Sequence, residues 1–101
     1  MYAPPLRIIF QLDDHEPFAP LMAVSVPKRL FKKAVDRNLL KRRIREAYRL
    51  NKVELSILLK QKQKRLRLVV QYQQKEITNY QCIEKSLLAG LKKLSETLDR
   101  Q

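Results

Sequence analysis

Glycine, cysteine and histidine are almost absent from this 101-residue sequence, which contains one of each. A Walker phosphate loop and a dinucleotide-binding fingerprint both need several glycines, so Gly90 alone excludes them. A single cysteine, Cys82, excludes an intramolecular disulfide and a zinc ribbon. No apolar run is long enough to span a bilayer, and the N-terminus lacks the basic-then-apolar order of a signal peptide. We therefore expect a cytoplasmic location and no membrane partner.

Residues suited to catalysis are equally scarce. His15 lies in an Asp-Asp-His-Glu run, where an exposed turn is the default and an adventitious metal the alternative. Cys82 has no histidine near it, so we expect a buried or semi-buried inert thiol rather than a nucleophile. The carboxylates show no spaced pair that suggests acid–base chemistry. We expect no catalytic residue, no protein-bound metal and no small-molecule substrate.

Positive charge is abundant and unevenly distributed. The net charge is +12, and residues 28–49 carry ten bases and only two acids. Two thirds of the excess thus lies within 22 residues, whereas a merely solvated basic face usually interleaves acids. With 45% apolar residues the chain can still form a core. We expect one domain, residues 1–101, with a surface that binds a polyanion.

Hydrophobic periodicity predicts an α/β fold, an α+β sandwich in which two helices pack against one small mixed sheet of three or more strands. We expect the first two strands to be antiparallel and joined by a loop. Thr78 or Asn79 can cap the last helix. The predicted elements are strands at 6–12, 21–26 and 66–72, loops at 13–20 and 60–65, a helix from Ala34 that 53–59 prolongs by a turn or two, and a last helix with Ile83, Leu87, Leu91, Leu94 and Leu98 on its apolar face.

The helix from Ala34 has two distinct faces. A core stripe has i, i+4, i+7, i+8 spacing, at Leu40, Ile44, Ala47 and Tyr48. Basic residues occupy an arc of roughly 100° centred about 130° away, at Lys41, Arg42, Arg45 and Arg49, with Asn38 on the same side. Glu46 can pair with Arg42 or Arg49. A row of arginines suits phosphates, because each guanidinium can donate two parallel hydrogen bonds.

Aromatic residues could add stacking on bases. Phe31, Tyr48 and Tyr72 are candidates, although a core position is the simpler interpretation for each. We expect Phe10 to be in the core.

Residues 25–49 resemble the signature of the bacterial ribonuclease P protein subunit, in which a Val-Ser-x-Lys-Lys lead-in precedes Ala-Val-x-Arg-Asn and Lys-Arg-x-x-Arg-Glu-x-x-Arg. The resemblance extends over roughly residues 6–95. The matching positions are Ser25, Lys28, Arg29, Ala34, Val35, Arg37, Asn38, Lys41, Arg42, Arg45, Glu46 and Arg49.

The resemblance implies a ribonucleoprotein endonuclease, a hydrolase that removes 5′ leaders from precursor tRNA. The RNA subunit is the catalyst and holds Mg²⁺, and the protein docks on that RNA and assists substrate binding. A ribosomal-protein-like fold with a left-handed βαβ crossover is also implied, against the usual right-handed rule. The implied RNA-binding residues are Lys28, Arg29, Lys32, Lys33, Arg37, Asn38, Lys41, Arg42, Arg45 and Arg49.

The sequence departs from the family pattern at two places. Leu39 stands where the family usually has a second arginine, so either one phosphate contact is absent or Arg43 supplies it from a nearby face. Family members normally begin with a helix that helps wall the cleft for the single-stranded 5′ leader. This sequence starts with residues 1–5 directly before the first strand, so we expect that helix to be lacking.

Two other functions remain open from the sequence. A ribosomal-protein-like binder of structured RNA would share the basic helix but would not affect tRNA processing. A stand-alone nuclease would cleave without an RNA partner, and the missing acid–base residues argue against it.

Overall fold

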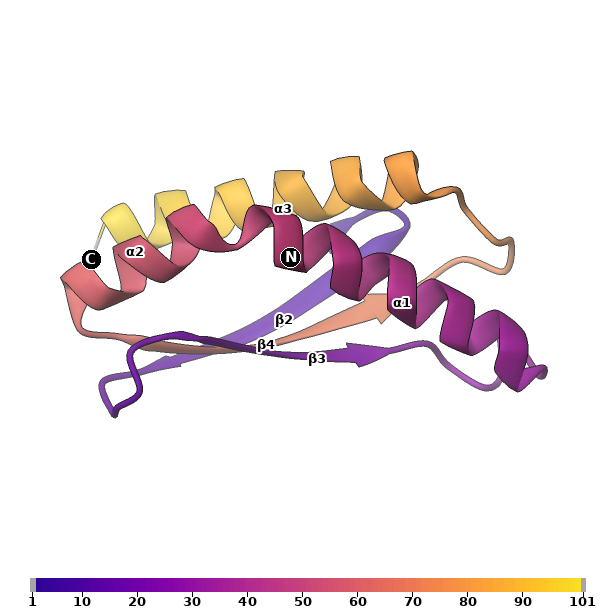
Figure 1. The fold of residues 1–101 in the computed structure, drawn as a ribbon, viewed down its shortest axis with the longest axis horizontal. Coiled ribbons are helices and arrows are strands. Elements are labelled where there is room, and N and C mark those ends of the chain that lie inside the picture. The colour runs from indigo at the N-terminus through magenta and orange to yellow at the C-terminus, as the bar shows by residue number, and fades with distance from the viewer. Residues whose placement is uncertain (1, 101) are drawn as a thin grey trace.

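The computed structural model describes residues 2–100 and arranges them in two layers (Figure 1). Helices α1 and α3 run side by side over one face of the sheet, and no helix of residues 2–100 covers its other face. This α+β sandwich confirms the predicted fold class. The elements are β1 (Tyr2–Ala3), β2 (Leu6–Asp13), β3 (Pro20–Ser25), α1 (Ala34–Asn51), α2 (Val53–Lys62), β4 (Arg65–Tyr72) and α3 (Tyr80–Asp99).

The sheet is mixed, with strand order β1-β2-β4-β3. β4 pairs antiparallel with β2 and parallel with β3. The two predicted N-terminal strands, β2 and β3, therefore run in opposite directions, as expected, but they are not paired, because β4 lies between them. The alternate residues Leu66, Leu68, Val70 and Tyr72 of β4 are all buried, as expected for a strand in a sheet with one face covered by helices.

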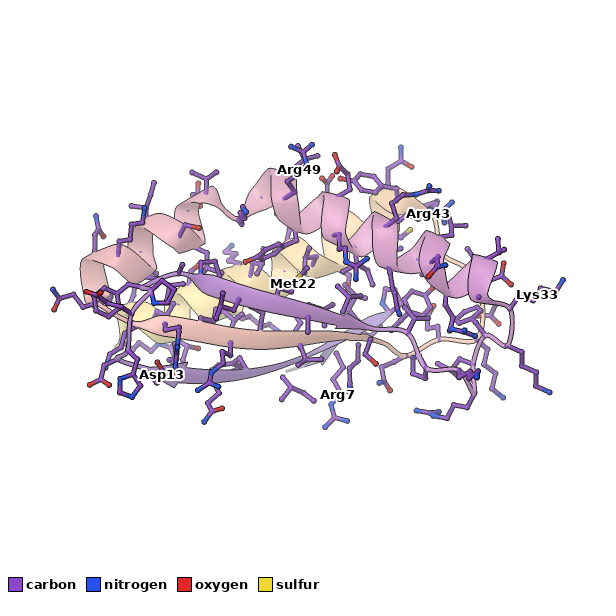
Figure 2. The ribbon with its side chains drawn as sticks, turned by 60° about the horizontal axis from the view of Figure 1, so that its bottom comes forward. Arg7, Asp13, Met22, Lys33, Arg43 and Arg49 are labelled. Atoms are coloured by element: carbon purple, nitrogen blue, oxygen red, sulfur yellow. The ribbon has the colours of Figure 1, made fainter. Side chains whose placement is uncertain are left out.

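The connection from β3 to β4 passes through α1 and α2. Seen from the helix side with both strands pointing up, β4 lies to the left of β3 (Figures 1 and 2). The crossover is left-handed, which confirms the expectation from the family resemblance and opposes the usual rule.

The helical segment after β3 is two helices, not one. A single helix prolonged by 53–59 and a loop over 60–65 were predicted, and both predictions are wrong. The break falls at Lys52, where the Asn51 side chain donates to Ala47 O at 2.7 Å and to Glu84 Oε2 at 3.2 Å. Helix α2 continues to Lys62 because Leu55 and Leu59 are buried while Lys60 and Gln61 are exposed. Gln63 ends it in the left-handed conformation, with φ 53°.

Both predicted core stripes are confirmed. The buried residues of α1 are Leu40, Ile44, Ala47 and Tyr48. Helix α3 buries all five predicted apolar positions, from Ile83 to Leu98, and Asn79 caps it by accepting a hydrogen bond from Cys82 N at 2.9 Å. No helix among residues 2–100 is long and apolar enough to cross a bilayer.

Phe10 is not in the core, contrary to the prediction. Its side chain is 37% exposed. The short strand β1 pairs only with Leu6 and Arg7, so β2 is an edge strand at Phe10 and leaves the ring partly uncovered.

Candidate nucleic-acid interface

The cationic face of α1 is exposed along its length. Asn38, Arg42, Arg45 and Arg49 are exposed, and Lys41 is half-buried beside the core stripe. From Asn38 to Arg49 the face extends about 17 Å along the helix. The helix thus presents apolar side chains to the sheet and cations to solvent.

The segment of residues 27–33, here called the basic connection, extends this surface beyond the start of α1. Lys28, Arg29, Lys32 and Lys33 are all exposed. Figure 2 shows Lys33 at the end of the molecule where α1 begins, with Arg49 near the other end of the helix. The structure therefore places the predicted residues on one helix and on the segment that leads into it.

Arg37 differs from the other predicted residues. It is half-buried, and its Nη1 atom donates to Phe31 O at 2.8 Å and to Lys32 O at 3.0 Å. Its guanidinium is thus directed at the backbone of the basic connection.

Arg49 forms an ion pair with Glu46, one of the two partners expected for that carboxylate. Arg49 Nη2 lies 2.6 Å from Glu46 Oε1, and both side chains are largely exposed. The hydrogen bonds from Arg49 hold the pKa of Glu46 below its ordinary value, and the same bonds raise the pKa of Arg49. An exposed pair of this kind is weak, so Arg49 can exchange Glu46 for a phosphate.

Arg43 points toward α3 and away from the cationic face. Its Nη1 atom donates to Thr78 O at 2.7 Å, which fixes the segment leading into α3. Leu39 is half-buried. This geometry favours the interpretation that one phosphate contact of the family pattern is absent, rather than supplied by Arg43.

Lys52 is a surface cation that the sequence reasoning missed. It follows Arg45 and Arg49 by seven and three residues, so it lies on the same helical face. Its Nζ atom lies 5.9 Å from the centre of the Tyr48 ring, within range of a cation–π contact. The spacing was visible in the sequence, but Lys52 lies beyond the end of the motif.

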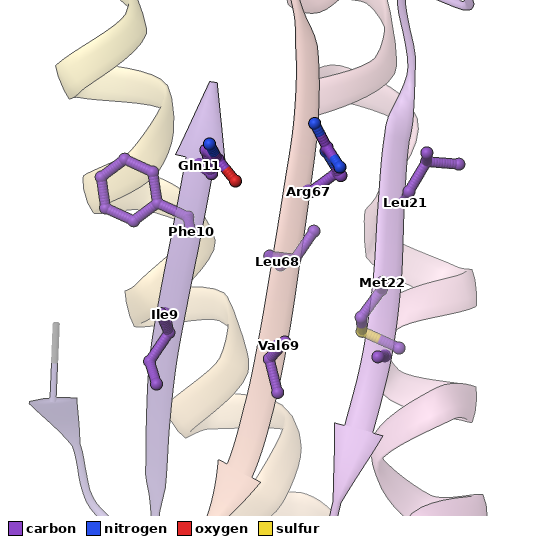
Figure 3. Close-up of a pocket in the computed structure, with 9 residues that line it drawn as sticks. Ile9, Phe10, Gln11, Leu21, Met22, Arg67, Leu68 and Val69 are labelled. Carbon is purple, nitrogen blue, oxygen red and sulfur yellow. The ribbon is translucent and has the colours of Figure 1, made fainter. Parts of the chain in front are cut away.

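The uncovered face of the sheet carries a shallow groove of about 480 Å³ (Figure 3). Ile9, Val69 and Ala23 form one row across β2, β4 and β3, and Gln11, Arg67 and Leu21 form the next. Ile9 and Leu21 are each 45% exposed. Arg7, Ile9 and Gln11 occupy every second position of the sequence of β2, whereas the residues beside them on β4 and β3 follow only from the strand order.

The aromatic candidates for base stacking are in the core. Phe31, Tyr48 and Tyr72 are buried, and the rings of Phe31 and Tyr72 are 5.7 Å apart. The simpler interpretation is confirmed for all three.

Cys82 and His15 lie outside the cationic surface. Cys82 is exposed, so the expectation of a buried or semi-buried thiol is wrong. The buried stripe of α3 begins at Ile83, and Cys82 lies about 100° away from it on the helix. His15 is exposed in the loop after β2, and its backbone N–H donates to Asp13 at 3.1 Å. Within the described part of the chain, no three His, Cys, Asp or Glu residues are grouped so as to hold a metal ion.

Comparisons with known proteins agree with the sequence motif. The family model described as Ribonuclease P matches residues 2–95. Two curated relatives named "Ribonuclease P protein component", from Porphyromonas gingivalis strains ATCC 33277 and W83, are each 35% identical over 88 residues. The match covers 86% of this chain and 64% of each relative, so the chain spans just under two thirds of their length. No solved structure matches the chain at a significant level.

Proposed function

The chain belongs to the ribonuclease P family, and on that basis we propose that it is the protein subunit of ribonuclease P. In this role it binds the catalytic RNA and assists removal of the 5′ leader from precursor tRNA. The protein contributes binding and positioning, and the RNA contributes the catalytic centre with its Mg²⁺. A cytoplasmic location follows from the proposed substrate.

One observation carries the proposal. The motif residues Arg42, Arg45 and Arg49 are exposed on one face of α1. The residues of the core stripe of the same helix are all buried, at Leu40, Ile44, Ala47 and Tyr48. Arg45 and Ile44 are adjacent in sequence, yet Arg45 faces solvent and Ile44 is 0% exposed. A helix with this division can dock on a phosphate backbone without disturbing the core.

The catalytic RNA is the partner proposed for this cationic surface. Exposed arginines can grip phosphates with two hydrogen bonds each, and the exposed lysines add point charges. The residues proposed to contact the RNA are Lys28, Arg29, Lys32, Lys33, Asn38, Lys41, Arg42, Arg45 and Arg49, with Arg37 contributing as described below.

Precursor tRNA is the proposed second partner, and the uncovered face of the sheet suits its single-stranded leader. The exposed side chains of Ile9 and Leu21 offer an apolar floor for unstacked bases. Arg67 beside them, and Arg7 one row away on the same face, offer charge for the phosphates.

Cleavage of a precursor tRNA by a bacterial ribonuclease P RNA at low Mg²⁺, with and without the protein, tests the function. We expect the protein to rescue cleavage, and RNA binding to weaken steeply with salt because counterions are released. The double variant Arg42→Ala/Arg45→Ala should lose most of the rescue.

The matched control is Lys92→Ala/Lys93→Ala, which removes the same charge from exposed positions on α3. It should rescue as well as the unchanged protein. Equal binding to unrelated structured RNAs, with no rescue, would instead identify a general RNA-binding protein. Cleavage without any RNA partner would contradict the non-catalytic role of the chain.

A further inference from the structure

We propose that Arg37 is a positioning residue of the RNA interface, and that it acts through the basic connection rather than by gripping a phosphate. This inference rests on the proposed function, since it concerns how four bases are presented to the RNA. It separates Arg37 from the exposed arginines of the same motif.

The first argument is the direction of the Arg37 side chain. On the helical wheel Arg37 lies about 60° from Leu40, within the arc of the core stripe, whereas Lys41, Arg45 and Arg49 lie at about 100° to 180°. Arg37 is half-buried, in keeping with this position. The side chain leaves α1 on the side of the protein core and not on the cationic side.

The second argument is the bonding of the guanidinium. Nη1 donates to Phe31 O at 2.8 Å and to Lys32 O at 3.0 Å. A charged donor strengthens such bonds, and two adjacent carbonyls held by one nitrogen fix the local path of the backbone. The side chains of Lys32 and Lys33 therefore project from the basic connection in fixed directions.

The third argument is what else holds the basic connection. Phe31 is buried against Tyr72, with ring centres 5.7 Å apart, and Phe31 N and Leu30 N donate to Pro27 O at 3.3 and 3.1 Å. The basic connection is thus held at Phe31 twice, by the buried ring and by the bonds from Arg37 to the carbonyls of Phe31 and Lys32. Lys28, Arg29, Lys32 and Lys33 surround this double anchor and are all exposed.

Loss of the Arg37 anchor has a defined consequence for binding. A flexible segment must lose conformational entropy when its bases meet the RNA, whereas a pre-arranged segment has already lost it on folding. Removing Arg37 should therefore weaken the contacts of Lys32 and Lys33 together, although their side chains remain in the protein.

Limited digestion of the free protein by trypsin tests the anchor without any RNA. Trypsin cleaves after Lys and Arg, so the basic connection contains four reporter sites. We expect Arg37→Ala to accelerate cleavage within residues 28–33 several-fold over the unchanged protein. Arg42→Ala, which removes the same charge from an exposed position of α1, should leave that cleavage unchanged. Equal cleavage in all three proteins would overturn the proposal.

RNA binding across a salt series then distinguishes positioning from direct contact. The salt slope is the change in the logarithm of the binding constant per unit change in the logarithm of the salt concentration. Loss of one phosphate contact in Arg42→Ala should reduce the size of this slope by roughly 0.7 to 0.9. Arg37→Ala should reduce the slope by about twice that amount, because the contacts of Lys32 and Lys33 both weaken. It should lower the affinity for the RNA about as much as Lys32→Ala/Lys33→Ala does. In the Lys32→Ala/Lys33→Ala background, Arg37→Ala should have less than about a two-fold further effect, because the three changes act on one set of contacts.

Full additivity in this cycle would show that Arg37 contacts the RNA independently and would overturn the proposal. Arg37→Met, which keeps most of the apolar stem but no donor, serves if Arg37→Ala does not fold. If the unchanged protein neither binds the RNA nor rescues cleavage, the proposed function fails. The trypsin result still decides whether Arg37 holds the connection.

Discussion

Arginine side chains of one helix serve different purposes in this protein. Arg42 and Arg45 are exposed, Arg49 is paired with Glu46, and Arg37 and Arg43 donate to backbone carbonyls. The number of arginines in the motif therefore exceeds the number that are free to meet a phosphate. These arginines are alike in chemistry, so their different roles follow from the direction in which each side chain leaves the helix.

Tyr48 has a buried hydroxyl with no hydrogen-bond partner among the described residues. Burial raises its pKa to about 12, so the group is neutral at any physiological pH. A buried unsatisfied polar atom is costly, and we expect Tyr48→Phe to raise the free energy of unfolding by about 1 kcal/mol. Urea denaturation followed by circular dichroism measures this change.

Tyr72→Phe is the matched control, because the Tyr72 hydroxyl is fully used. It donates to Glu76 O at 2.7 Å, accepts from Thr78 N at 3.0 Å and contacts Thr78 Oγ1 at 2.6 Å. Its removal should lower the free energy of unfolding by about 1–3 kcal/mol. A loss of stability in Tyr48→Phe of similar size would show that the Tyr48 hydroxyl is satisfied.

At the scale of elements, α1 combines a core stripe and a binding face within one helix. Its sequence predicted both faces because the helical period places every third or fourth residue on the same side. Its end was not predicted; the last residue of α1, Asn51, donates to Glu84 Oε2 of α3 at 3.2 Å, a contact between two helices. The sequence periodicity of one helix does not predict a contact with another helix.

The two faces of α1 should respond differently to truncation. Ile44→Ala leaves a cavity at a fully buried site and should cost about 2–5 kcal/mol of stability. Arg45→Ala should weaken RNA binding by about 1–3 kcal/mol and barely change folding, because it removes a charged contact at an exposed site. Thermal melts and RNA titrations of both variants measure the two effects. An equal loss of stability in the two variants would contradict the assignment of Ile44 to the core face and Arg45 to the exposed face of α1.

At the scale of the whole molecule, an ion-pair cluster joins segments that are far apart in the chain. Asp13 at the end of β2 accepts from Arg65 Nη2 at 2.8 Å and from Arg67 Nη2 at 2.9 Å, across more than fifty residues of sequence. Hydrogen bonds from Arg65, and then from His15 N and Arg67, hold the pKa of Asp13 well below its ordinary range. The cluster closes the end of the sheet where β2 meets β4.

The depressed pKa of Asp13 predicts how stability changes with pH. A group whose pKa is lower in the folded state stabilises the fold above its unfolded pKa, near pH 4, and loses this effect as the pH falls further. Asp13→Asn should therefore lower Tm between pH 5 and 7, and the difference from the unchanged protein should shrink below pH 4. Asp14→Asn, at the exposed neighbouring position, is the control and should show no such difference. A Tm difference that stays constant down to the lowest pH would contradict a role for the charge.

The part of the candidate site that consists of residues close together in the sequence was predictable. The spacing of Lys41, Arg45 and Arg49 located the cationic face, and the motif identified the family without any coordinates. The separate role of Arg37 was not predictable, because its carbonyl partners lie five and six residues back in an irregular segment. The sheet groove was not predictable either, since its rows join residues from three strands.

Local sequence patterns were enough to place β2, β3 and β4 to within one residue, but not the short strand β1. They also located the start of α1, the buried stripes of α1 and α3 and the basic character of the surface. These features depend on period, propensity and charge, which act over a few neighbouring residues. Three features became visible only in the folded protein: β4 lies between β2 and β3, Phe10 and Cys82 are exposed, and the helical segment breaks at Lys52. Those outcomes depend on contacts between segments distant in the chain, and packing chooses among arrangements that the local pattern allows equally.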